Sequence, residues 1–217
     1  MGETKPSARN KIVRSPNRAH YDKETLYQIL DAGFLCHVSY LFEGSSVIIP
    51  TAYVRKDDVI YIHGAMKNRM MNSILNQNQA CVAVTHLDGM VLARSAFHHS
   101  FNYRSAVIFG TPEVIEDANE KSRVLKLITD NILPDRWDEV REPSEKELTA
   151  TLVIGIKIDE ASVKIRSGAP VDDMQDYDLP IWAGELPLKQ VFTDPIADKV
   201  LSQGIDLPDS VKKAVKT

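Results

Sequence analysis

Short runs of apolar, β-branched and aromatic residues dominate the first third of the chain. The runs 34–42, 46–54 and 59–64 are separated by Glu43-Gly44 and by Lys56-Asp57-Asp58. Tight polar turns between such runs predict antiparallel strands joined as hairpins. A further run, 80–87, ends at Asp88-Gly89, a dipeptide typical of a turn. The strand pattern continues in four later segments: 90–97, 104–115, 148–158 and 161–168.

Four segments instead show helical spacing. A helix opened by Asp22 or Lys23 is expected to run to Gly33. Residues 65–78 place Met66, Met70 and Ile74 on one stripe, as a helix would. Two capping-box patterns open the other helices, one over 118–132 and one shorter; they are Asp117-x-x-Glu120 and Ser144-x-x-Glu147.

Six or seven short strands with few helices predict a mainly β fold, a small closed or partly closed β-barrel with flanking helices. The helices fill gaps between hairpins and do not alternate with strands as in a βαβ unit. We expect a flexible N-terminal arm over 1–20 and one domain over 21–190. The proline-rich tail 191–217 is expected to pack on the barrel or on a partner subunit.

Composition narrows the class of protein. The chain has 217 residues, 43% hydrophobic and 26% charged, with a net charge of -4, which argues against generic nucleic-acid binding. No apolar run approaches the ~18 residues of a membrane helix, and the polar N-terminus lacks a secretory signal. Cys36 and Cys81 lie inside apolar runs, as buried thiols in a reducing compartment do. These features predict a cytoplasmic protein.

Several common catalytic motifs are absent from the sequence. No two of the ten glycines stand in a G-x-G arrangement, so the dinucleotide fingerprint and the glycine-rich phosphate loop are both missing. Neither H-E-x-x-H nor G-x-S-x-G occurs. Any phosphate must therefore be held by side chains and a helix start.

The segment 61–71 offers such a place. Lys67, Asn68 and Arg69 are expected in the first turn of a helix, where the helix dipole disfavours cations. Free backbone N–H groups beside two cations would bind a phosphate well. A solvated basic surface is the alternative interpretation.

The segment 96–110 combines two histidines with Tyr103-Arg104-Ser105 at the start of an apolar strand. An arginine entering a barrel strand needs an anionic or aromatic partner. His98 and His99 would point to opposite faces of an extended chain, so we predict no metal site. Ordinary hydrogen-bonded histidines are the alternative. Trp182, between prolines, is expected either to plug the barrel or to form a planar wall against a ligand.

Taken in order, "VIIPTAYVRKDDVIYIHGAMKNR", "ARSAFHHSFNYRSAVIFG" and "WAGELPL" resemble the flavin-binding split-barrel proteins related to pyridoxamine 5′-phosphate oxidase. The similarity is strongest to the branch that includes the nitroimidazole-resistance reductases, and it covers roughly residues 20–190. The resemblance implies a six-stranded antiparallel split barrel of Greek-key type. It also implies a homodimer with FMN bound between the subunits.

Residue by residue, the resemblance implies a cofactor site built from several segments. Strand backbone would meet the flavin ring, the basic turn would hold the phosphate, and Trp182 would approach from the other subunit. The oxidase itself has Ser-Arg-Lys where this chain has Lys-Asn-Arg, and its C-terminal substrate motif is missing, which disfavours a vitamin B6 oxidase. Related barrels bind haem or a deazaflavin. The implied cofactor-binding residues are Pro50, Thr51, Ala52, Ile62, His63, Lys67, Asn68, Arg69, Tyr103, Arg104, Ser105 and Trp182.

These expectations lead to a hypothesis and two alternatives. The first is an FMN-dependent oxidoreductase that passes electrons from a reduced nicotinamide donor to a small acceptor such as a nitroaromatic, a quinone or oxygen. His63 or His99 would relay protons, because imidazole titrates near neutral pH. The second is a non-catalytic flavin- or haem-binding sensor, in which His98 or His99 is an axial ligand. The third is an interaction domain with an empty pocket.

Overall fold

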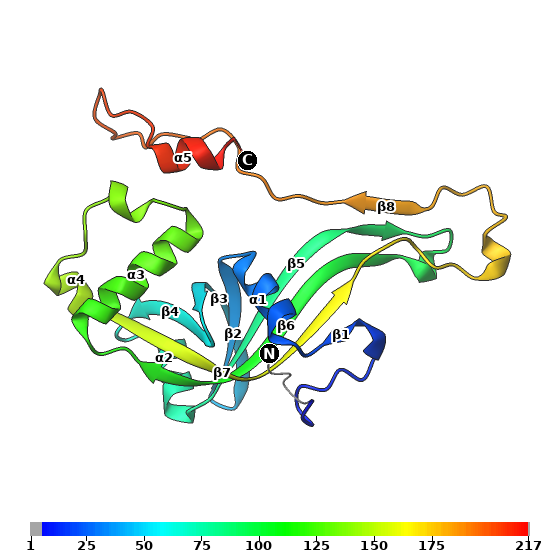
Figure 1. Ribbon diagram of the computed structural model, residues 1–217, viewed down its shortest axis with the longest axis horizontal. Coiled ribbons are helices and arrows are strands. Elements are labelled where there is room, and N and C mark those ends of the chain that lie inside the picture. The colour runs from blue at the N-terminus through cyan, green and yellow to red at the C-terminus, as the bar shows by residue number, and fades with distance from the viewer. Residues whose placement is uncertain (1–5, 217) are drawn as a thin grey trace.

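The computed structural model describes residues 6–216 and contains a closed six-stranded antiparallel barrel (Figure 1). The strands follow the order β7-β4-β3-β2-β5-β6, and pairing between β6 and β7 closes the barrel. The mainly β barrel predicted from the sequence is therefore confirmed. Its strands are β2 (Leu35–Phe42), β3 (Ser45–Lys56), β4 (Val59–Ala65), β5 (Ala80–Leu92), β6 (Ser100–Val114) and β7 (Thr151–Arg166).

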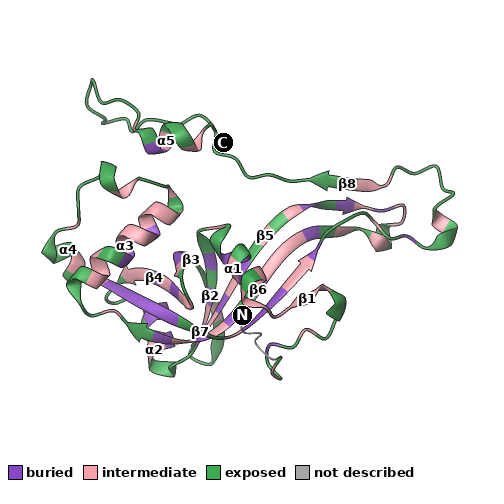
Figure 2. Ribbon diagram, viewed as in Figure 1, coloured by how far each residue is buried: buried purple, intermediate pink, exposed green. Residues whose placement is uncertain are grey.

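The buried apolar residues form two clusters, and along the strands buried residues alternate with more exposed ones (Figure 2). In β2, Cys36, Val38 and Tyr40 point inward and are almost fully buried, while their neighbours face outward. This inner layer is covered at the ends by α1 (Lys23–Asp31) and α2 (Arg69–Gln77). A second, smaller layer lies on the outside of β3, β4 and β7, beneath α3 (Ala118–Ile132).

The helix starts follow the predicted caps in three cases. Asp22 accepts a hydrogen bond from the Thr25 amide at 2.8 Å, and Asp117 accepts one from the Glu120 amide at 2.8 Å. Ser144 and Glu147 form a complete capping box that opens α4 (Glu145–Ala150). Each cap satisfies amide groups that the first helical turn leaves unpaired.

The predicted start of the second helix at residue 65 is wrong. Strand β4 continues through Ala65, and α2 begins only at Arg69. The side chain of Asn68 caps this helix by accepting a hydrogen bond from the Met71 amide at 3.1 Å. Lys67 therefore precedes the helix, Asn68 is its cap and only Arg69 lies in the first turn.

Two predicted strand breaks are also wrong. Strand β5 passes straight through Asp88-Gly89, with a register shift between Leu87 and Gly89 in place of a turn. A short strand missed by the sequence analysis, β8 (Gly184–Pro187), pairs with β5 there. A Cβ on Gly89 would lie 2.8 Å from the Leu186 carbonyl oxygen, so this close pairing requires glycine. Strand β7 likewise runs unbroken through residues 159 and 160.

The ends of β5 and β6 extend beyond the barrel and form an arm with β8 (Figure 1). Two single turns, η2 (Ala96–His98) and η4 (Met174–Asp176), lie in this part of the chain, and a strap of residues 188–207 leads from the arm to α5 (Asp209–Ala214). At the other terminus, residues 1–5 lie outside the described residues. The segment 6–20 contacts β7, where buried Asn10 donates to the Ala161 carbonyl at 3.1 Å. It includes η1 (Pro16–Arg18) and β1 (Ala19–His20), which pairs with β7.

Replacing Gly110 with alanine is expected to lower the free energy of unfolding by about 2 kcal/mol. Gly110 follows a register shift between β6 and β7, and a Cβ there would lie 2.2 Å from the Lys157 carbonyl oxygen. A backbone oxygen cannot move aside without disturbing the strand pair. Urea unfolding followed by circular dichroism measures the loss. Gly155→Ala is the matched control, because its added methyl would meet only side-chain atoms of Tyr61 and Val59 at 3.2 Å. Equal losses in the two variants would contradict this explanation.

Candidate functional site

The connection from β4 to α2 forms the rim of an open cavity of about 570 Å³. The chain turns tightly there, since a Cβ on Gly64 would lie 2.8 Å from the Met71 sulfur. Lys67 and Arg69 both line the cavity and are exposed. The remaining lining side chains are neutral: Met66, Asn72, Ser73, Asn76 and Gln77.

The two cations at this rim have no acidic partner. Arg69 donates to the Tyr40 hydroxyl at 3.2 Å, and its guanidinium lies 4.1 Å from the centre of the Phe42 ring. Among residues 6–216, no carboxylate forms an ion pair with Lys67 or Arg69. Positive charge beside the free amides of a helix N-terminus is suited to binding a phosphate. The Asn68 side chain contributes to this site as the helix cap.

His63 lies next to this basic turn on the outer face of β4. Its neighbour Ile62 is fully buried in the barrel and is paired with Tyr53 and Ile154 on the two flanking strands, so neither its side chain nor its backbone is open to a cofactor. The Nδ1 atom of His63 is buried and has no hydrogen-bond partner within the described part of the chain. Burial lowers the pKa of His63 from its usual value. The ring is therefore neutral at pH 7 and carries an unsatisfied nitrogen, which is an unfavourable arrangement unless a ligand meets it.

Strand pairing brings the predicted Pro50-Thr51-Ala52 segment to the same region. Tyr53 pairs with Ile62 in the β3–β4 register, which places Ala52 beside His63. Pro50 is exposed, while Thr51 and Ala52 are half-buried. Eight of the predicted cofactor-binding residues, on β3, β4 and the start of α2, thus belong to one neighbourhood of a single chain.

The other four predicted residues lie far from this neighbourhood. His63 pairs with Val153 and Arg104 pairs with Ile165, twelve residues further along β7, or about 40 Å along the strand. Tyr103 and Ser105 flank Arg104 on β6, and Trp182 is 68% exposed on the arm. One chain cannot bring the two groups to one small ligand.

Asp88 is the anionic partner of Arg104, of the kind that the sequence predicted. The Arg104 guanidinium donates to both carboxylate oxygens of Asp88, with Nη2 at 2.8 Å and Nε at 3.0 Å. This bidentate pair holds the pKa of Arg104 above its usual range. Arg104 therefore has a partner within its own chain, and a ligand is not required to balance its charge.

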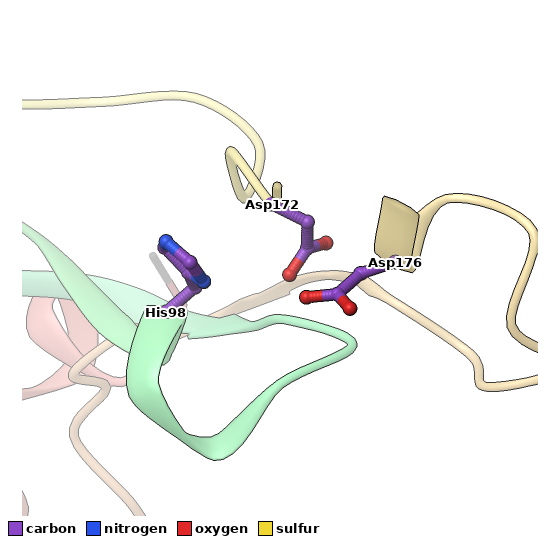
Figure 3. Close-up of side chains that lie close together, drawn as sticks. All are labelled: His98, Asp172 and Asp176. Carbon is purple, nitrogen blue, oxygen red and sulfur yellow. The ribbon is translucent and has the colours of Figure 1, made fainter. Parts of the chain in front are cut away.

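The two adjacent histidines lie at the tip of the arm, where both bond to Ser95. His98 Nδ1 lies 2.8 Å from the Ser95 hydroxyl, and His99 Nδ1 lies 2.9 Å from the Ser95 carbonyl oxygen. Figure 3 shows His98 beside Asp172 and Asp176, with ligand atoms of all three within 4.8 Å of one another. Asp172, however, already accepts from the Arg94 guanidinium at 3.1 Å and from two backbone amides. Both carboxylate oxygens of Asp172 are thus already engaged by Arg94 and the backbone.

Sequence reasoning missed a buried polar group in the arm. Asn102 and Arg166 are only 7% and 8% exposed, on β6 and β7. Arg166 stands at the end of the apolar alternation "ASVKIR", a position where a charged side chain is unusual. That position was the signal available in the sequence.

No helix within residues 6–216 is long and apolar enough to cross a membrane. A family model described as pyridoxamine 5′-phosphate oxidase matches residues 22–165. No curated protein sequence matches the chain.

Among solved structures, the flavocytochrome Anf3 from Azotobacter vinelandii is 36% identical, with a TM-score of 0.89 over 96% of this chain and 97% of that chain. The FAD and haem binding protein from Mycobacterium smegmatis is also 36% identical, with a TM-score of 0.85 over 91% and 97%. A structure described as a 5-nitroimidazole antibiotic resistance protein from Bacteroides thetaiotaomicron is 22% identical, with a TM-score of 0.58 over 68% and 86%. The chain belongs to the pyridoxamine 5′-phosphate oxidase family.

Proposed function

We propose that this protein is a flavin-dependent oxidoreductase that also holds a haem. Electrons would pass from a reduced nicotinamide donor through the flavin to a small acceptor such as a nitroaromatic, a quinone or oxygen. The observation that carries the proposal is the buried, unpaired Nδ1 of His63 directly before the basic turn at Lys67 and Arg69. The two solved proteins of 36% identity, a flavocytochrome and an FAD and haem binding protein, support it.

The flavin phosphate would lie at the start of α2. Lys67 and Arg69 supply charge, and the helix supplies amides that its own turns leave free. FMN, FAD and a deazaflavin all carry a phosphate, so a phosphate site of this kind would accept any of them. We propose FAD in place of the FMN expected from the sequence, because the similar Mycobacterium smegmatis protein binds FAD. Both Lys67 and Arg69 would favour the added negative charge of a reduced flavin.

The haem iron would be held by His63. A neutral imidazole is the form that binds iron, and burial keeps His63 neutral. His99 is the competing candidate, since its Nδ1 is fixed by the Ser95 carbonyl while the side chain is exposed. His63 is preferred because its buried nitrogen lacks a partner, whereas the exposed part of His99 can be satisfied by water. When bound, haem would supply one-electron and oxygen chemistry.

The absorbance spectrum of the purified protein tests the proposal directly. We expect the visible absorbance bands of a flavin together with the Soret band of a haem. Acid release followed by chromatography separates FMN from FAD. Mixing with NADH and either a quinone or a nitroaromatic then measures turnover. Bound cofactors without turnover would favour a non-catalytic sensor, while a colourless protein that gains neither band on reconstitution would refute the proposal.

We also propose that the protein is a homodimer. The strap is tied at both ends, by β8 pairing with β5 and by Ser210, whose amide donates to Glu139 at 3.0 Å. Its apolar side chains nevertheless project into solvent, with Ile196 97% and Val200 84% exposed (Figure 2). Leu35 and Ile48 on the outer faces of β2 and β3 are exposed as well. A second copy would cover these surfaces, and it would bring Arg104 and Trp182 of one chain to the His63 neighbourhood of the other.

Replacing both Ile196 and Val200 with aspartate is expected to raise the dimer dissociation constant at least tenfold. Each carboxylate would have to be desolvated when the strap meets its partner. Sedimentation velocity over a dilution series measures the constant. Val13→Asp is the control, because Val13 is 79% exposed outside the strap. A monomeric parent protein at micromolar concentration would contradict the dimer.

A further inference from the structure

A second cavity, of about 260 Å³, lies in the arm between β5, β6, the end of β7 and β8. Its polar lining consists of Asp88, Asn102, Arg104, Arg166 and Glu185, with Ser167 at its edge. We call it the arm pocket. Among these residues, only Arg104 was expected from the sequence to bind a cofactor.

Arg166 is the unusual member of the arm pocket. The residue is 8% exposed, yet its guanidinium bonds only to neutral acceptors: the side-chain oxygen of Asn102, the Gly168 carbonyl at 3.0 Å and the Ala169 carbonyl at 3.4 Å. No carboxylate within the described chain forms an ion pair with it, and its buried Nε has no partner. Burial lowers the pKa of Arg166 from its usual value. A buried charge is costly unless an opposite charge and full hydrogen bonding accompany it.

The other charges around the arm pocket do not supply that partner. Asp88 is committed to the bidentate pair with Arg104. Glu185 attracts the Arg166 charge but forms no ion pair with it; instead, Asn102 Nδ2 donates to Glu185 at 2.6 Å while Asn102 Oδ1 accepts from Arg166. The bond from Arg166 thus fixes which side of the amide is the donor. The Asn102 amide has two N–H groups, so one remains for another acceptor.

We propose that the arm pocket binds the carboxylate of a small organic molecule. The available donors are Arg166 Nε and the second N–H of Asn102, which match the two oxygens of one carboxylate. A phosphate dianion would need more donors, and Asp88 and Glu185 would repel its second charge. The carboxylate has two chemical sources: a free organic acid, or the propionate of a bound haem. Only the second source rests on the function proposed above.

The side-chain Nε–Hε resonances of arginine in ¹⁵N-labelled protein report binding at Arg166. We expect titration with acetate or propionate to shift the Arg166 signal, and acetamide at the same concentration to leave it unmoved. Arg166→Lys, which keeps the charge but lacks Nε, identifies that signal and is expected to weaken acetate binding about tenfold. Binding to this variant is followed by calorimetry.

A second variant tests the arm pocket without changing Arg166, in case Arg166→Lys does not fold. Ser167 is exposed at the edge of the arm pocket, so Ser167→Glu leaves the buried bonds intact and offers an internal carboxylate. We expect it to weaken acetate binding at least tenfold, whereas Asn119→Glu, with the same added charge on the exposed side of α3, should not. Equal acetate affinity in the two glutamate variants would overturn binding of a free acid.

Haem and its dimethyl ester distinguish the two sources. If the pocket holds a propionate, the ester is expected to bind at least tenfold more weakly than haem, and haem loading should abolish the acetate shift. If the pocket serves a free acid, both haem forms bind alike and acetate still titrates. The proposal is overturned when acetate moves no Arg166 signal and both haem forms bind equally. A protein without flavin or haem would refute the proposed function, while the acetate titration would still decide the pocket.

Discussion

Replacing Lys67 and Arg69 together with glutamine is expected to weaken flavin binding about 1000-fold. Each cation would donate a charge-assisted hydrogen bond to the phosphate, and two such bonds contribute about 4 kcal/mol together. Within the described residues 6–216 neither side chain has an acidic partner, so the charge lost is charge available to the ligand. Flavin fluorescence quenching, measured after removing bound cofactor and adding it back, gives the dissociation constant.

The fold is expected to tolerate this double change. Both side chains are exposed, and the hydrogen bond of Arg69 to Tyr40 together with its contact on Phe42 lies at the surface. Thermal unfolding should therefore remain close to that of the parent. The control removes two cations near another helix start, Arg141→Gln with Lys146→Gln at α4. Parent-like flavin affinity in the Lys67 and Arg69 variant would place the phosphate elsewhere.

The proposed phosphate site could be predicted from the sequence because every signal for it is local. His63-Gly64 at a strand end, a basic turn and the stripe of Met70 and Ile74 all fall within twelve residues. The detail that failed was the helix boundary. The pattern of apolar and polar residues over 65–68 is compatible with either a helix or the end of a strand. In the structure Ala65 pairs with Thr151 on β7, so β4 extends to residue 65. A partner nearly ninety positions away leaves no trace in the local pattern.

The same reason explains the error at Asp88-Gly89. This dipeptide favours a turn in isolation, but β8, about a hundred residues later in the sequence, pairs with the backbone at Gly89. Glycine is required for the close approach of Leu186 and not for a reversal of the chain. An Asp-Gly dipeptide therefore fits either a turn or a closely paired strand, and the sequence cannot separate the two until the pairing strand is known.

Charge pairing was the least predictable part of the site. The sequence predicted an anionic or aromatic partner for Arg104 near the start of β6, and the structure contains an anionic one. The partner is Asp88, across the β5–β6 pair. It was not predicted because a turn was expected at Asp88, where the structure has a continuous strand. Arg166 is a different case: the sequence marks it only as an unusual charge at the end of an apolar alternation, and no carboxylate within residues 6–216 forms an ion pair with it. Tertiary structure, and not residue type, decides whether half-buried Arg104 or buried Arg166 has a carboxylate partner.

Replacing His63 with leucine is expected to remove the haem Soret band and to leave the flavin bands in place. The substitution deletes the iron ligand while keeping an apolar side chain of similar volume on the outer face of β4. It also deletes a buried nitrogen that has no partner, so the free energy of unfolding of the cofactor-free protein should stay level or rise slightly. Absorbance titration with haem, together with urea unfolding, measures both effects.

Two further variants make this result specific to iron ligation. His63→Gly opens space for free imidazole, and adding imidazole should restore the Soret band, which a merely structural role for His63 would not explain. His99→Leu removes the competing candidate, whose Nδ1 is held by the Ser95 carbonyl, and should leave haem binding unchanged. Loss of the Soret band in His99→Leu with retention in His63→Leu would move the haem to the arm. That outcome would leave the unpaired nitrogen of His63 to be satisfied by the flavin, and His63 would then be a cofactor contact without an iron.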